Sequence, residues 1–403
     1  MQALMRALPR LTQLADLELQ CRTVDLAVLA PPLCSLTTLT RLDVSDCRVS
    51  EGGTGTFASA LTRLTRLADL KLCAVPGRVL ARALDTLTAL TSLDLDRLDD
   101  DDDGVQALAR TFERLSLLVV LRMTLDGCGA ASAAALTVAL DTRTALTALQ
   151  LSNVCHNAVF VLAPALSRLS RLAGLRMAHS ELGPEGTALL AAPVALLTTL
   201  TLLDLTDNGV RDEGLCAEAL APALSRLSRL ADLSLGYNRL RAAGVVALAP
   251  ALSTLTALTR LVFVGDAVGT DGVDALAECL RHLTLLADLR LTYMRLGDGD
   301  AALLAPALHH LTALQQLHLS HNGLRDAGAE HLAPALSRLP RLAELHLHNN
   351  NIGDAGCGRL LSELPPRSPL HTFDVASNRI SKSLAAKEAV ALSRLFALTC
   401  LRL

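Results

Sequence analysis

The sequence predicts an α/β solenoid, in which one short strand followed by one helix recurs along the chain. The phrase L-x-x-L-x-L returns at a step of mostly 28 residues, opening at Leu14, Leu39, Leu67, Leu90, Leu118, Leu146, Leu172, Leu200, Leu230, Leu258, Leu286, Leu314, Leu342, Leu370 and Leu398. Each repeat also changes its hydrophobic period halfway. Residues 230–240 alternate leucine with variable residues, as a strand does, whereas residues 242–257 place leucine and valine at helical spacing, with a glycine ahead of the helix.

The repeats indicate a single domain over residues 1–403. Residues 1–13 read as the helical half of a partial repeat, residues 14–397 as fourteen repeats, and residues 398–403 as the strand of a further partial repeat. Local geometry is expected to depart from the average where the spacing does, in the repeats opening at Leu14, Leu67, Leu146 and Leu200. Neither end carries a polar cap, which leaves open a fragment, a truncated gene model, or self-association through uncapped ends.

Composition argues against several classes of function. Hydrophobic residues are 51% of the chain, aromatic residues are only 2% and Trp is absent, so the aromatic platforms that bind single-stranded nucleic acid are missing. The formal charge of −3 offers no basic stripe for nucleic acid. Arg, Asp, Glu or Thr interrupts every apolar run short of the roughly 18–20 residues that a membrane span requires. We therefore expect neither nucleic acid nor a membrane among the partners.

The N-terminus and the cysteines favour a cytoplasmic protein. Residues 1–14 contain no continuous apolar segment and no small-residue cleavage site, so they do not indicate a secretory signal. The cysteines are spread singly, without a C-x-x-C pair, at positions 21, 34, 47, 73, 128, 155, 216, 279, 357 and 400. Buried, reduced thiols explain this spacing better than disulfides or structural zinc.

Polar residues recur at the ninth position of the repeats, where the chain leaves the strand. They are Asn208, Asn238, Asn322, Asn350 and Asn378, with Cys47 in the same place. A side-chain amide at this point can satisfy backbone groups. A buried stack of such groups is stable only if each finds partners in the next repeat, so the sequence predicts an inter-repeat hydrogen-bond ladder.

The combined pattern L-x-x-L-x-L-x-x-[NC]-x-L-x-x-x-G-x-x-x-L resembles the ribonuclease-inhibitor-like class of leucine-rich repeats, from Leu14 to Leu403. The resemblance implies a horseshoe with parallel strands on its concave face, helices on its convex face and right-handed crossovers throughout. It leaves function open, because that class has many unrelated roles.

The variable strand positions should form columns across the concave sheet, and the C-terminal columns are the richest in polar and aromatic side chains. The fifth position reads Arg290, His318, His346 and Asp374, with His348 at the seventh and His321 at the eighth. Tyr237 and Tyr293 both occupy the eighth position, two repeats apart. Exposed tyrosine is a common binding anchor. We predict that these eight residues form the footprint of a protein partner.

Two groups of residues could hold a metal, and for both we favour a structure without one. The histidine column with Asp374 has suitable donors, but strand spacing alone does not make them converge tetrahedrally. The alternative is a pH-sensitive polar face. Asp99 to Asp103 followed by Gly104 resembles the start of a calcium loop, yet Arg110 stands at the twelfth place instead of Glu.

Motifs for phosphate binding, nucleophilic catalysis or zinc hydrolysis do not stand out above the repeat. The sequence therefore predicts a non-enzymatic scaffold that needs no cofactor and binds a protein partner on its concave face. One alternative is a GTPase activator, because Gly77-Arg78-Val79 resembles the arginine motif of Ran GTPase-activating proteins, which implies a role for Arg78 in stabilising transition-state charge. Another is an inhibitor of a secreted or cytosolic enzyme, although near-neutral charge and the lack of Trp argue against a ribonuclease as target.

Overall fold

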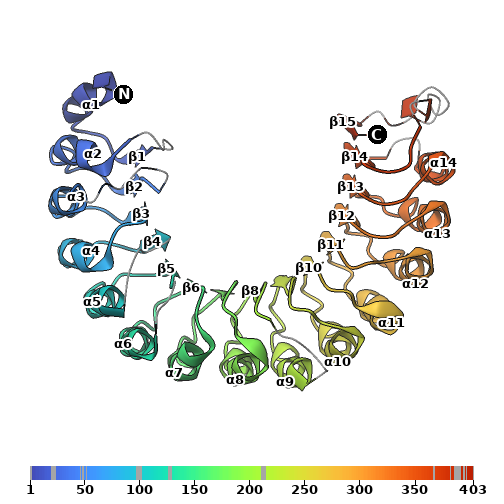
Figure 1. Ribbon diagram of the computed structural model, residues 1–403, viewed down its shortest axis with the longest axis horizontal. Helices are drawn as coiled ribbons and strands as arrows, with labels where there is room; N and C mark the ends of the chain where they lie inside the picture. The colour runs from blue at the N-terminus through green and yellow to red at the C-terminus, as the bar shows by residue number, and fades with distance from the viewer. Residues whose placement is uncertain are drawn as a thin grey trace. The chain divides into compact units, whose positions relative to one another are not determined.

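The computed structural model describes the chain apart from residues 1, 20–23, 46, 48, 49, 51, 97–101, 126–128, 210–214, 366, 367, 382, 385–391, 394, 396 and 403. It contains two compact units. The N-terminal unit comprises residues 1–182 and 192–199, and the C-terminal unit comprises residues 183–191 and 200–403. Within each unit, strands alternate with helices along the sequence (Figure 1).

The strands of the N-terminal unit form a parallel sheet whose spatial order follows the sequence. They are β1 (Asp16–Glu18), β2 (Arg41–Asp43), β3 (Asp69–Cys73), β4 (Ser92–Asp96), β5 (Val120–Thr124), β6 (Ala148–Ser152) and β7 (Gly174–Arg176). Leu42 lies opposite Leu17 on one side and Leu70 on the other. The register advances by one repeat per strand, so residues at equal positions of the repeat form columns.

The C-terminal unit repeats this arrangement. Its parallel strands are β8 (Leu202–Asp204), β9 (Asp232–Ser234), β10 (Arg260–Val264), β11 (Asp288–Thr292), β12 (Gln316–His318), β13 (Glu344–His346), β14 (Thr372–Asp374) and β15 (Cys400–Arg402). Here His346 pairs in register with His318 and with Asp374. The fifth-position column predicted from the sequence is therefore confirmed.

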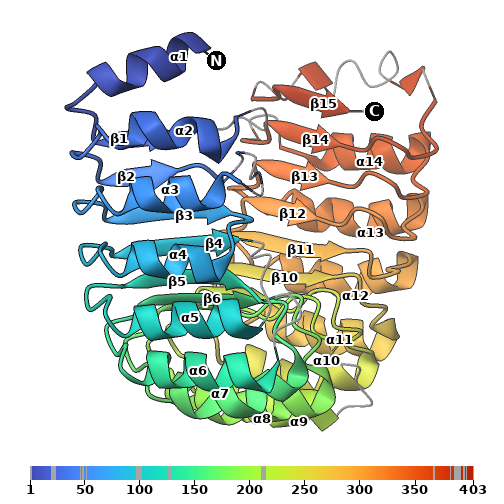
Figure 2. The ribbon, with the colours of Figure 1, turned by 60° about the vertical axis from the view of Figure 1, so that its left-hand side comes forward.

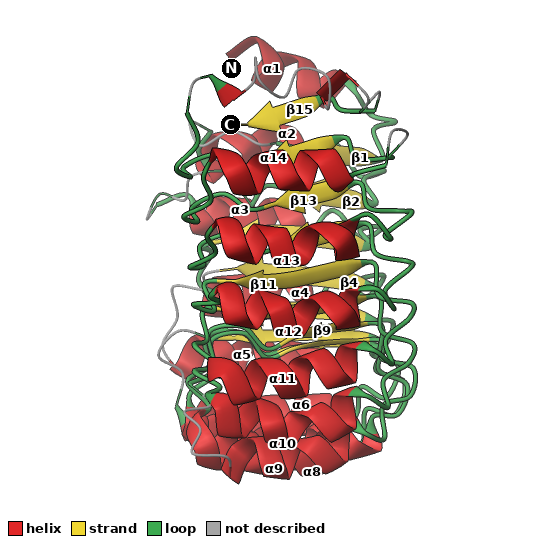
Figure 3. Cartoon of the chain, turned by 90° about the vertical axis from the view of Figure 1, so that its right-hand side faces the viewer, coloured by secondary structure: helices red, strands yellow, loops and turns green. Residues whose placement is uncertain are grey.

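The second half of each repeat is helical. The helices are α1 (Gln2–Ala7), the 3-10 turn η1 (Leu8–Arg10), α2 (Leu26–Leu33), α3 (Thr54–Leu61), α4 (Gly77–Leu84), α5 (Asp102–Phe112), α6 (Ala130–Asp141), α7 (His156–Leu166), α8 (Gly183–Leu196), α9 (Leu215–Leu224), α10 (Ala242–Leu252), α11 (Gly269–Leu280), α12 (Asp298–Leu308), α13 (Asp326–Leu336) and α14 (Asp354–Glu363). Helices α2 to α5 lie in front of their strands in Figure 2, and α11 to α14 do so in Figure 3. This alternation of parallel strands and helices confirms the predicted α/β solenoid. Within the described part of the chain, no helix combines the length and hydropathy needed to cross a membrane.

The short repeat that opens at Leu67 departs from the others between its strand and its helix. Residues 74–76 connect β3 to α4, whereas residues 235–241 connect β9 to α10. Helix α4 has 8 residues and α10 has 11. The repeat that opens at Leu67 is thus shorter in its loop and its helix, whereas its strand still pairs with the neighbouring strands.

Leucine side chains from both halves of every repeat form the core. Leu233 of β9 and Leu252 of α10 are both 0% exposed, and the same holds for their equivalents Leu261 and Leu280 in the next repeat. Burying such a side chain fully contributes about 1.5–3 kcal/mol. One repeat cannot enclose its own leucines, so this contribution depends on the repeats on either side.

The repeat glycine was expected ahead of the helix, and that placement was wrong for the C-terminal repeats. Gly356 is the third residue of α14, inside its first turn. The reason is the neighbouring carboxylate of Asp326, whose Oδ1 accepts hydrogen bonds from the N–H groups of Gly353 at 2.6 Å and Gly356 at 2.9 Å. A Cβ on Gly356 would stand 2.6 Å from that oxygen. The starts of α13 and α14 are therefore capped by a carboxylate of the preceding repeat, Asp298 and Asp326 respectively, and only glycine leaves room for the cap.

The predicted asparagine ladder is present. Asn238 is fully buried, and its Nδ2 donates to the carbonyls of Leu205 in the preceding repeat and Leu235 in its own, both at 2.8 Å. Its Oδ1 accepts the N–H of Asn208 at 2.9 Å. Asn322, Asn350 and Asn378 bond in the same way. One amide thereby satisfies buried backbone groups of two repeats, which would otherwise cost about 1–3 kcal/mol each.

Asp266 occupies the ladder position in the repeat between Asn238 and Met294. It is 0% exposed, its Oδ1 accepts the N–H of Arg239, and its Oδ2 is buried without a hydrogen-bond partner among the described residues. Burial raises the pKa of this carboxyl to about 7, although backbone N–H groups, including that of Arg239, favour the ionised form. An ionised carboxylate cannot donate as the asparagine amide does, whereas the protonated acid can.

Gly356→Ala should destabilise the chain by about 1–3 kcal/mol, because the new Cβ displaces the Asp326 carboxylate. This is the net effect: the steric cost exceeds the gain of about 1 kcal/mol that alanine brings over glycine within a helix. Gly299→Ala, also in a first helical turn but with no atom within 4 Å of the position that its Cβ would take, is the control and should stabilise slightly. Urea unfolding followed by circular dichroism measures both, and equal effects would contradict the steric argument.

Stability should fall with rising pH because of Asp266. Its pKa is about 7 in the folded chain and near 3.8 when unfolded, so the folded state keeps a proton that the unfolded state loses. The stabilisation is complete below about pH 4 and declines until about pH 7, by up to ~1.4 kcal/mol per pH unit. Asp266→Asn should remove this slope and be the more stable protein at pH 8. Thermal melts from pH 4 to 8 test it, and parallel curves for the two proteins would refute it.

Candidate functional site

In most of the described repeats, though not at Leu125, the eighth residue takes a left-handed backbone conformation. Its φ lies between 52° and 81° at Ala74, Asn153, His179, Asp207, Tyr237, Gly265, Tyr293, His321, Asn349 and Ser377. Such a residue ends the strand and turns the chain toward the ninth-position ladder. The side chains at this position are consequently carried on a series of equivalent turns beside the sheet.

Both tyrosines of the chain lie on these turns and are exposed. Tyr237 is 47% exposed and Tyr293 is 46% exposed. The ring of Tyr237 lies over the next turn, where a Cβ on Gly265 would overlap the nearest ring carbons. Gly265, with φ of 81°, thus provides a flat support for the ring.

The ring of Tyr293 continues into the histidines. It stacks on His321 with centroids 4.0 Å apart and an interplanar angle of 13°. His321 meets the edge of His348 at 5.1 Å, and its Nε2 lies 3.2 Å from Asn349 Nδ2. These contacts hold the exposed ring of Tyr293 against His321, next to His348.

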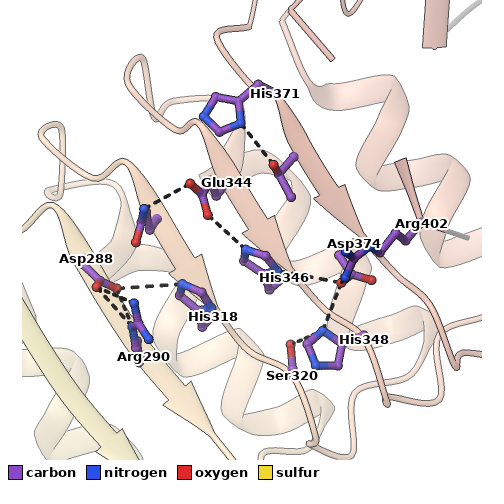
Figure 4. Close-up of polar contacts among 12 residues, drawn as sticks. Asp288, Arg290, His318, Ser320, Glu344, His346, His348, His371, Asp374 and Arg402 are labelled. Atoms are coloured by element: carbon purple, nitrogen blue, oxygen red, sulfur yellow. Dashed lines mark hydrogen bonds and ion pairs between the residues drawn. The ribbon is translucent and has the colours of Figure 1, made fainter. Parts of the chain in front are cut away.

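In the fifth-position column, His318 of β12 stacks on His346 of β13, with centroids 4.4 Å apart and rings 5° from parallel (Figure 4). The pKa of His318 is lowered to about 4, mainly by burial and also by the neighbouring His346 and Arg290, while Asp288 raises it by a smaller amount. His318 is therefore neutral near pH 7. Neutrality explains how two imidazoles can stack without mutual repulsion.

Arg290 belongs to the column but is held within its own strand. Its Nε donates to both carboxylate oxygens of Asp288 at 3.1 Å. The same carboxylate forms an ion pair with Arg260, whose Nε lies 3.1 Å away, and it lies 4.0 Å from His318 Nε2. Asp288 thus links Arg290 to the histidine side of the column.

Three members of the predicted set converge at the other end of the column. The Oδ2 atom of Asp374 lies 3.4 Å from His348 Nδ1 and 3.9 Å from His346 Nδ1. Asp374 is only 3% exposed although it is an acid. Burial lowers the pKa of His348, against the opposing effect of Asp374. The spacing of the strands alone does not predict that the nitrogen atoms of His346 and His348 lie so close to the Asp374 carboxylate.

Tyr237 is not part of the cluster of His346, His348 and Asp374. Several residues that contact this cluster were not among those predicted from the sequence. Glu344 Oε2 lies 3.3 Å from His346 Nε2, Ser320 Oγ lies 3.0 Å from His348 Nδ1, and Arg402 Nη1 lies 3.5 Å from Asp374 Oδ2. Their repeat positions, the third, seventh and fifth, are the signal that could have identified them.

Arg78 is the second residue of α4, near the start of the helix. Its Nη2 lies 2.5 Å from Asp103 Oδ2 in the following repeat. Asp102 accepts bonds from Ser132 and Gly129, which lower its pKa. The acidic run is thus used for contacts between repeats in its described part, while Asp99, Asp100 and Asp101 lie outside the described residues.

Four segments of the chain match a known family model. Residues 35–54, 197–217, 310–333 and 341–361 match the family model described as Leucine Rich repeat. A solved internalin from Listeria monocytogenes is similar over 98% of this chain and 87% of its own, with 17% sequence identity and a TM-score of 0.42. No curated protein sequence matches the chain. The repeats and the family model together identify a leucine-rich repeat protein.

Gly265→Ala should displace the ring of Tyr237 and destabilise its turn by about 1–2 kcal/mol through left-handed backbone strain. Tyr237 emission in a Tyr293→Phe background is a clean probe, since the chain has two Tyr and no Trp. Gly209→Ala is the control, with a φ of 59° but open space around its Cβ. It should share the strain and leave the emission unchanged. Identical emission in both variants would show that Gly265 does not support the ring.

Proposed function

We propose that this chain is a non-enzymatic scaffold that binds a protein partner through the inner face and rim of its C-terminal unit. Leucine-rich repeat proteins generally mediate protein–protein interaction, which supports the broad assignment. The rim consists of Tyr237, Tyr293 and His321. The face consists of Arg290, His318, His346, His348 and Asp374.

The observation that carries the proposal is that both tyrosines are nearly half exposed yet already in contact with a neighbour, Tyr293 with the ring of His321 and Tyr237 with Gly265. An aromatic ring offers a large contact area and a hydroxyl group that can donate or accept. Ordering a free side chain on binding costs about 0.5–1.5 kcal/mol, and a ring already fixed by its neighbours avoids much of this cost. Such residues are frequent binding hot spots.

The charges of the face favour a partner of mixed polarity. Neutral His318 stands between the ion-paired Arg290 and the Asp374 group, whose carboxylate faces Arg402. Opposite charges alternate over short distances, so neither a strongly basic nor a strongly acidic partner is favoured. We expect hydrogen bonding to the polar groups, around apolar contacts made by the tyrosines.

Within the same proposal, the repeats belong to the ribonuclease-inhibitor-like class and the protein works in the cytoplasm. The 28-residue step with a full α-helix in most repeats supports the class. Burial of Cys279, whose thiol pKa is raised to about 12 by desolvation, fits a structural reduced cysteine. The ion pair of Arg78 with Asp103 favours a structural role for that arginine over the GTPase-activating alternative.

Affinity capture from a lysate of the source organism tests the proposal, with the full chain as bait beside a Tyr237→Ala, Tyr293→Ala double variant. We expect a defined set of proteins to be depleted at least tenfold on the double variant, as for loss of hot-spot residues. Val246→Ala, which removes an exposed side chain from the helical face of α10, is the matched control and should retain them. Quantitative mass spectrometry measures the depletion, and full retention of every partner by the double variant would reject this surface.

A further inference from the structure

His346, His348 and Asp374 each direct one donor atom into a common space. The donor atoms all lie within 4.8 Å of one another. His346 and His348 are two residues apart, at the end of β13 and just beyond it, and Asp374 lies beside His346 in register on β14. Figure 4 shows dashed contacts from both imidazoles meeting at the carboxylate of Asp374.

We propose that these three side chains form a binding site for a divalent transition-metal ion, with Zn²⁺ as the best fit. Two imidazole nitrogens and one carboxylate oxygen are ligands typical of Zn²⁺, whereas Ca²⁺ and Mg²⁺ prefer oxygen alone. Three protein ligands leave a fourth position for water or for a donor from another molecule. This site goes beyond the scaffold proposal, and its test uses the metal alone.

Two of the three donor–donor distances are close to those around such an ion, and the third lies within 4.8 Å. Ligand atoms about 2.0–2.1 Å from a tetrahedral metal are roughly 3.3–3.4 Å from each other. Asp374 Oδ2 is already 3.4 Å from His348 Nδ1, and it is 3.9 Å from His346 Nδ1. About half an ångström of ring movement, on the order of a small change in χ angle, would close the larger of these two distances to Asp374.

The surrounding groups orient these donors as outer-shell partners of a metal site do. Glu344 Oε2 lies 3.3 Å from His346 Nε2, and a carboxylate there favours the tautomer that carries its proton on Nε2 and offers the lone pair of Nδ1 to a metal. Glu344 is itself fixed by Gln316 Nε2, which donates to its other oxygen at 3.1 Å. The backbone N–H of Ala376 donates to Asp374 Oδ1 at 3.1 Å and so keeps Oδ2 toward the histidines.

Arg402 and Ser320 occupy the positions that a metal would affect. Arg402 Nη1 is 3.5 Å from Asp374 Oδ2, and the arginine side chain is 66% exposed, so it can move into solvent when an ion takes its place. Ser320 Oγ bonds His348 Nδ1 at 3.0 Å. Metal binding through Nδ1 would break this bond, and the hydroxyl could then bond to a water on the open metal position.

Direct binding to the tag-free, chelator-treated full chain tests the site. We expect one Zn²⁺ per chain by isothermal titration calorimetry, with binding weakened at least tenfold by His348→Ala and by Asp374→Asn. His282→Ala, an exposed histidine outside the cluster, is the matched control and should bind as the wild type does. Glu344→Gln should weaken binding about tenfold while keeping all three ligands, as outer-shell substitutions do.

Co²⁺ provides a readout that distinguishes this site from binding at cysteines. A visible d–d spectrum without a thiolate charge-transfer band is expected, and it should disappear in His348→Ala while the circular dichroism spectrum stays unchanged. A thiolate band, or Zn²⁺ binding that His348→Ala and Asp374→Asn leave intact, would overturn the proposal. A wild-type chain that binds no Zn²⁺ would overturn it equally. None of these outcomes bears on partner capture through the tyrosines.

Discussion

The hydrogen bonds of the ninth-position side chain are the constraint on which the rest of the C-terminal unit depends. Asn322 donates to the carbonyls of Leu291 and Leu319 at 2.8 and 3.0 Å and accepts the N–H of Met294 at 2.9 Å. One amide thereby fixes the turns of two successive repeats. Those turns carry Tyr293 and His321, so the stacking of the two rings follows from the ladder beneath them.

Because each strand is one repeat further along the chain, side chains at the same repeat position form a column across the sheet. Residues of like charge can then become neighbours. The structure relieves this in two ways. Arg260 lies between acids, with Asp232 at 3.4 Å and Asp288 at 3.1 Å. In the fifth-position column, burial keeps His318 neutral where it stacks on His346. Charge alternation and suppressed ionisation thus allow a polar surface to be built on a regular repeat.

The features that follow from periodicity could be predicted from the sequence, whereas those that depend on side-chain direction could not. The strands, the helices, the asparagine ladder and the column of His318, His346 and Asp374 follow from counting residues. The glycine of the first helical turn was misplaced because the carboxylate that requires it comes from the preceding repeat. The approach of His348 to Asp374 depends on side-chain torsions across two strands, which residue spacing does not specify.

The two tyrosines are equivalent by repeat position but are supported by chemically different groups. The turn of Tyr293 is fixed by Asn322, an amide whose hydrogen bonds do not change with pH. The turn of Tyr237 is followed in the next repeat by Asp266, whose Oδ1 accepts the N–H of Arg239. Because the pKa of Asp266 is raised to about 7, its ionisation near neutral pH leaves a buried charge with one unpaired oxygen. The unfavourable free energy of this buried charge destabilises the turn of Tyr237 but not the turn of Tyr293. The two turns are therefore alike in geometry and different in stability.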